Sequence, residues 1–64
     1  MAQVDGKTVK IGDRVSFKSD VEQGGEIIAI AGNVLTLNNP HGFHGEYIGG
    51  QTVTTVRASD CWIE

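Results

Sequence analysis

The fold of this chain is decided by one stretch, Glu26-Ile27-Ile28-Ala29-Ile30-Ala31-Gly32-Asn33-Val34-Leu35-Thr36-Leu37. Its first half, residues 26–31, is β-branched and nearly all apolar, as is typical of a central strand buried on much of both faces. Gly32 and Asn33 both tolerate positive φ, which two-residue hairpin turns demand. Residues 34–37 then form the antiparallel partner. The stretch therefore predicts a β-hairpin at the centre of the fold.

More strands are predicted on both sides of this hairpin. Residues 14–18 alternate strictly between polar and apolar side chains, as a half-buried strand requires. Residues 51–57 are rich in threonine and valine, and after one tight turn at residues 58–60 a short closing strand covers residues 61–63. Within residues 1–10, a turn at Asp5-Gly6 predicts a small extra ribbon. No stretch holds apolar residues at helical spacing, so we expect an all-β protein.

Two segments break this pattern. Residues 38–51 hold Pro40, several glycines and two histidines, and a connection this long in a small domain is more often functional than an ordinary link between strands. The shorter segment, residues 19–23, is acidic and is expected to be a loop between the first two strands of the main sheet.

Residues 9–17, Val-Lys-Ile-Gly-Asp-Arg-Val-Ser-Phe, and residues 23–30, Gln-Gly-Gly-Glu-Ile-Ile-Ala-Ile, resemble the KOW and Tudor-like family of small barrels. The shared pattern is a Gly-Asp-x-Val opening, a polar loop and then Gly-x-Val-x-x-Ile. The resemblance implies a five-stranded SH3-like barrel, with Val15 and Phe17 facing the interior and Gly25 at a sharp bend. Proteins of this family serve in ribosomes, in transcription elongation, in methyl-lysine reading and in phages.

A looser likeness is to the type II plasmid dihydrofolate reductase, a short barrel that builds its active site only as a tetramer. Gly12-Asp13-Arg14-Val15 and Lys18-Ser19 are similar to that enzyme. Its Val-Gln-Ile-Tyr strand has no counterpart, because Val53-Thr54-Thr55-Val56 stands near that place. The sequence therefore keeps an oligomeric enzyme of this kind only as a distant third hypothesis.

Length and charge restrict the class of protein. Sixty-four residues make one domain, residues 1–64, and a net charge of −3 argues against a general binder of polyanions. Cys61 is the only cysteine, which fits a reducing compartment better than an export route. Residues 1–6 have neither the basic nor the apolar region of a signal peptide, and the longest apolar run is too short to cross a bilayer. We expect a cytoplasmic protein with no membrane partner.

Two groups of side chains and one isolated residue are candidates for binding. Lys10, Arg14 and Lys18 form a basic stripe along the first strand of the main sheet, in a region where most of the basic residues gather. The long loop contributes Phe43, His44 and Tyr47. Finally, alternation in the central strand places Ile28 and Ile30 opposite Ile27, so a small barrel should turn one set outward unless the strand bends.

The residues for catalysis are missing. His41 and His44 lack the third and fourth ligands that a structural zinc site recruits, so no metal is expected. Cys61 follows Asp60, whose charge would raise the thiol's pKa rather than activate it. The glycines of the long loop form no phosphate-binding fingerprint, because no helix follows them. We expect no enzyme and no cofactor.

Two classes of function remain. The first is a binding or adaptor module that contacts a protein partner or further copies of itself, a homodimer being the commonest form. The second is a KOW-like module that contacts nucleic acid through residues 7–18, which the net acidity disfavours.

Overall fold

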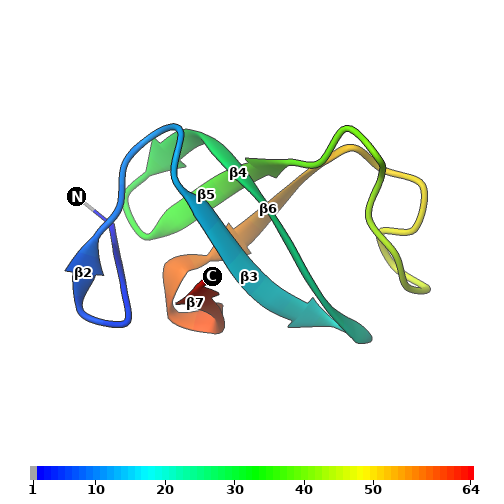
Figure 1. The fold of residues 1–64 in the computed structure, drawn as a ribbon, viewed down its shortest axis with the longest axis horizontal. Helices are drawn as coiled ribbons and strands as arrows, with labels where there is room; N and C mark the ends of the chain where they lie inside the picture. Colours follow the sequence, from blue (N-terminus) through cyan, green and yellow to red (C-terminus); the bar gives the residue numbers. More distant parts are fainter. Residues whose placement is uncertain (1) are drawn as a thin grey trace.

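The computed structural model describes residues 2–64; the expected ribbon of residues 1–10 begins at Met1, which lies outside the described residues. The elements in chain order are β1 (Gln3–Val4), β2 (Lys7–Thr8), β3 (Arg14–Ser19), β4 (Val21–Ala31), β5 (Val34–Asn38), β6 (Val53–Arg57), the 3-10 turn η1 (Ala58–Asp60) and β7 (Cys61–Ile63). The all-β prediction is confirmed, as are the ribbon, the central hairpin and the closing turn and strand (Figure 1).

The main sheet has the strand order β6-β5-β4-β3-β7, and every neighbouring pair is antiparallel. Strand β4 is long enough to serve both halves of the sheet: residues 21–26 pair with β3 and residues 26–31 pair with β5. A strand shared in this way must bend between the two halves, and Gly25 lies at that place. A β-carbon on Gly25 would lie 3.1 Å from the Asn38 carbonyl oxygen, closer than ordinary packing. The chain is a five-stranded SH3-like barrel.

The prediction of an acidic loop at residues 19–23 is wrong. Residues 21–23 belong to β4, and Ser19 pairs directly with Val21, so Asp20 alone makes the turn. Asp20 adopts a φ of 65°, a left-handed conformation that aspartate tolerates better than most residues. The acidic and polar side chains here are compatible with an exposed strand edge, which is why composition suggested a loop.

A β-bulge decides which isoleucines of β4 are buried. The register with β5 shifts between Ile27 and Ala29, so Ile28 is the extra residue. The shift allows both Ile27, which is fully buried, and Ile30 to pack on the core, although strict alternation would separate them. Ile28 is left 41% exposed on the outer face. The bulge thus turns Ile30 inward and leaves Ile28 outside. From the sequence we expect one set of isoleucines to face outward unless the strand bends, and both outcomes occur in part.

The two edges of the main sheet differ. At the β7 edge the N-terminal ribbon packs against the sheet: the Ile63 amide donates a hydrogen bond of 2.9 Å to the Asp5 carboxylate, and Val4 is buried. Asp5 holds this position in a left-handed conformation, with a φ of 53°. At the other edge, β5 is the one strand of residues 2–64 that pairs with β6. Within residues 2–64, no helix is long and apolar enough to span a membrane.

Candidate functional site

A groove of about 280 Å³ lies between the end of β3 and strand β6. Its lining has an apolar part, a charged part and the strand β6 itself. The lining residues are Phe17, Lys18, Ser19, Ile48, Thr54, Thr55, Val56, Arg57 and Asp60. The groove thus brings together two sheet segments and the long loop, which are distant in sequence.

One wall of the groove is the unpaired edge of β6. The Ala58 amide donates to the Asn33 carbonyl at 2.8 Å, and the Asn39 amide donates to the Thr52 carbonyl at 2.8 Å. Hydrogen-bonded pairs alternate with non-bonded pairs in an antiparallel ladder. With the observed register, Thr54 and Val56 therefore bond to β5, while the backbone groups of Val53, Thr55 and Arg57 point away from it. Thr55 and Arg57 both line the groove.

The opposite wall is also only partly paired. Strand β7 pairs with residues 15–17 of β3 and begins at Cys61, opposite Phe17. Among the described strands, Lys18 and Ser19 therefore pair only with β4. The groove lies where the barrel is not closed by backbone hydrogen bonds.

The long loop supplies Ile48 to the groove and is tied to the turn between β3 and β4. The Gln23 side chain clamps the His44 backbone, accepting from its amide at 2.8 Å and donating to its carbonyl at 2.9 Å. The Asp20 carboxylate accepts a hydrogen bond from the Glu46 amide at 2.7 Å. These contacts hold the loop so that Ile48 packs partly against the core. Residues 19–23, expected to be a loop, thus position the long loop.

The basic stripe expected along β3 is divided by ion pairs. The Lys10 ammonium lies 3.2 Å from the Asp13 carboxylate. The hydrogen bond from the Lys10 amide, together with this ion pair, lowers the pKa of Asp13. Arg14 bonds to Glu64 at 3.1 Å. Within residues 2–64, neither Lys18 nor Arg57 lies within ion-pair distance of a carboxylate, and both line the groove. The structure therefore brings Lys18 together with Arg57 rather than with Lys10 and Arg14.

The three binding candidates on the long loop, Phe43, His44 and Tyr47, lie in different environments. Phe43 is buried in the core, where its ring lies 5.7 Å from that of Phe17, so its expected surface role is wrong. Two backbone hydrogen bonds, from the Phe43 amide to Gln51 and from the Gly50 amide to Phe43, draw this part of the loop inward. The side chain of His44 is exposed, and Tyr47 is 78% exposed. Neither lines the groove.

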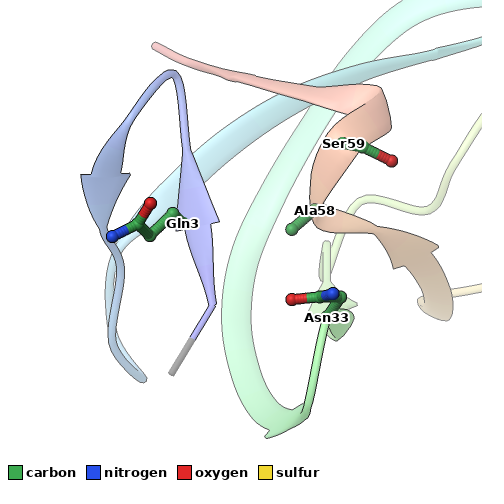
Figure 2. Close-up of a pocket in the computed structure, with 4 residues that line it drawn as sticks. All are labelled: Gln3, Asn33, Ala58 and Ser59. Atoms are coloured by element: carbon green, nitrogen blue, oxygen red, sulfur yellow. The ribbon is translucent and has the colours of Figure 1, made fainter.

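A second hollow, of about 270 Å³, lies between the ribbon and the 3-10 turn. Figure 2 shows Gln3 of β1 on one side and Ala58, Ser59 and the hairpin residue Asn33 on the other. All four lining side chains are neutral and none is aromatic. The hollow offers hydrogen bonds but no charge, so we take the groove beside β6 as the better candidate site.

Potential metal ligands do not cluster among the described residues, and the thiol of Cys61 is buried. Across residues 2–64, no three His, Cys, Asp or Glu side chains gather where they could hold a metal ion. Burial raises the pKa of Cys61 to about 11, and the Asp60 charge adds to this. The thiol also donates to the Arg57 carbonyl at 3.4 Å. At neutral pH the sulfur is therefore a protonated, buried group.

Sequence reasoning selected Lys18 and missed the rest of the groove. Arg57 carried a weak signal, because it is the single basic residue after Ser19 and ends a strand of threonine and valine. The contribution of Ile48 had no local signal, since it depends on the bonds that Gln23 and Asp20 make to the loop. Neither a protein-family model, nor a curated protein, nor a solved structure matches this chain.

Proposed function

We propose that this chain is a non-catalytic binding module that acts through protein–protein contact, holding an extended segment of a partner in the groove beside β6. Strand addition to an exposed sheet edge gives affinity through main-chain hydrogen bonds and specificity through pockets for alternate side chains. The resemblance of residues 9–17 and 23–30 to KOW and Tudor-like barrels agrees with a binding role.

One observation carries this proposal: one edge of the main sheet is covered and the other is exposed. The β7 edge is covered by the ribbon and the Asp5 carboxylate, whereas β6 presents unpaired backbone groups to a groove. Exposed edges invite unwanted pairing, and proteins usually block them with charges, proline or a covering segment. An uncovered edge of five residues beside an apolar wall supports a docking role.

A nucleic-acid module is the alternative. Its basic stretch, residues 7–18, loses two of its cations to ion pairs with Asp13 and Glu64. Non-specific affinity for nucleic acid comes mainly from lysine and arginine side chains that neutralise phosphates, and the net charge of −3 opposes the approach of a polyanion. These facts favour a protein partner. A second copy of this chain is a further protein partner, for which Ile28 on the outer face provides a separate surface.

The test is a selection of random heptapeptides displayed on phage, carried out on the wild-type protein and on Thr55→Pro. Proline at residue 55 removes an amide that points away from β5, so the fold should survive while strand addition is blocked. We expect peptides that bind the wild type and lose at least tenfold in affinity for Thr55→Pro. Backbone amide shifts of Thr55, Arg57 and Lys18 should change when these peptides bind.

Thr55→Ala is the matched control, because it keeps the amide and should bind peptides like the wild type. Single-stranded RNA and duplex DNA are titrated in parallel by fluorescence anisotropy. Tight binding of either that weakens steeply with salt, together with no peptide selected at the groove, would replace the proposal by the nucleic-acid alternative.

A further inference from the structure

In both walls of the groove, apolar and charged side chains point in different directions. On β3, Phe17 is buried and Lys18 is exposed; on β6, Val56 is half-buried and Arg57 is exposed. Alternation along each strand thus places apolar groups at the bottom of the groove and cations at its mouth. Ile48 adds to the apolar bottom.

An added strand must follow the same period of two. Hydrogen bonds to the Thr55 backbone and to the Arg57 amide would fix its orientation, so its successive side chains would point alternately to the bottom and to the mouth. The bottom suits apolar side chains. The mouth carries Lys18 and Arg57, which have no carboxylate partner within residues 2–64, and one carboxylate, Asp60, is in the lining.

We infer that the segment held in this groove is an extended peptide of alternating apolar and acidic residues, its apolar side chains against Phe17, Ile48 and Val56 and its carboxylates between Lys18 and Arg57. This inference rests on the proposed function and names the chemistry of its ligand. A second copy of β6 is a poorer occupant, because residues 53–57 contain no acid and would bring another Arg57 to the mouth.

Three capped, fluorescein-labelled heptapeptides test the pattern by anisotropy at moderate salt. The first alternates glutamate and valine, the second has the same composition with the valines and glutamates in separate blocks, and the third alternates lysine and valine. We expect the first to bind at least tenfold more tightly than the other two. Arg57→Glu should weaken the first peptide by at least tenfold and strengthen the third.

Lys7→Glu is the matched control: it makes the same kind of charge reversal on β2, outside the groove lining, and should change the affinity less than twofold. Arg57→Gln serves as a milder variant, with circular dichroism as the check on folding. Equal binding of the alternating and the block peptide would overturn the inferred pattern, and tighter binding of the lysine peptide would overturn the inferred charge. Either result leaves strand addition intact, provided that Thr55→Pro still weakens peptide binding at least tenfold. If no peptide of any sequence binds at the groove, the inference and the proposed function both fail.

Discussion

Phe17 joins the core to the groove, because its ring packs against Phe43 and also lines the bottom of the proposed site. Its alternation with Ser16 and Lys18 predicted a buried position, and it is 3% exposed. Phe43 was not assigned to the core, since glycines and histidines around it indicated a surface loop. A local pattern thus identified one ring of the pair, while the other depends on a loop that turns inward.

Replacing Phe17 by alanine should lower the free energy of unfolding by about 3–5 kcal/mol, because a buried ring is lost and Phe43 loses its neighbour. Urea unfolding followed by intrinsic fluorescence measures this. Lys18→Ala, at the adjacent exposed position, should change stability by less than about 0.5 kcal/mol. A loss below about 1 kcal/mol for Phe17→Ala would contradict its place in the core.

Cys61 makes the free energy of unfolding depend on pH in the alkaline range. Burial raises the folded-state pKa of its thiol from 9.0 to about 11. The contribution to stability is therefore fully present below about pH 9 and is lost as pH rises toward the folded-state pKa, because the unfolded chain gives up the proton first. Cys61→Ala should show a weaker decline of the unfolding free energy between pH 9 and pH 11 than the wild type. Identical pH profiles would contradict the raised pKa.

Strand β6 has two chemically different sets of amides. Those of Thr54 and Val56 bond to β5, whereas those of Thr55 and Arg57 face the groove. After transfer to deuterated water, Thr55 and Arg57 should exchange much faster than Thr54 and Val56, as amide-resolved NMR can show. Slow exchange at Thr55 in dilute protein would mean that another segment covers the edge.

The strands themselves were largely predictable, and their connections were less so. Alternation in β3 and the threonine and valine content of β6 are local signals, and their bounds agree closely with the expected ones. The extension of β4 back to Val21 and the bulge at Ile28 arise from pairing with two different neighbours. The meeting of Lys18 with Arg57 depends on the arrangement of the whole barrel, so no local pattern could predict it.

At the scale of the whole molecule, the outer face of β4, β5 and β6 carries exposed apolar side chains. Ile28 and Val34 are each 41% exposed there, and the loop residues Phe43 and Ile48 pack on the core instead of covering them. Packing this face against the same face of a second copy about a two-fold axis would cover the side chains of Ile28 and Val34.

We therefore expect a homodimer through this face, held together by the apolar side chains. Multi-angle light scattering at increasing concentration should show the mass of a dimer, and Ile28→Lys should yield a monomer with an unchanged circular dichroism spectrum. Lys7→Glu, on the ribbon, is the control for a change in charge. A monomer at high concentration, or a dimer unaffected by Ile28→Lys, would rule out this interface.

The position of β7 also affects how the chain is made. This strand is the last element, yet it pairs with β3, the first strand of the main sheet, and its Ile63 amide bonds to Asp5 of the ribbon. The edge of β3 that faces β7, and the Asp5 carboxylate, therefore lack these partners until residues 61–63 have left the ribosomal exit tunnel. A nascent chain can form the hairpin of β4 and β5 earlier, but the barrel can close only after β7 has emerged. Until then the apolar side chains of β3 stay more accessible to chaperones and to other unfolded chains.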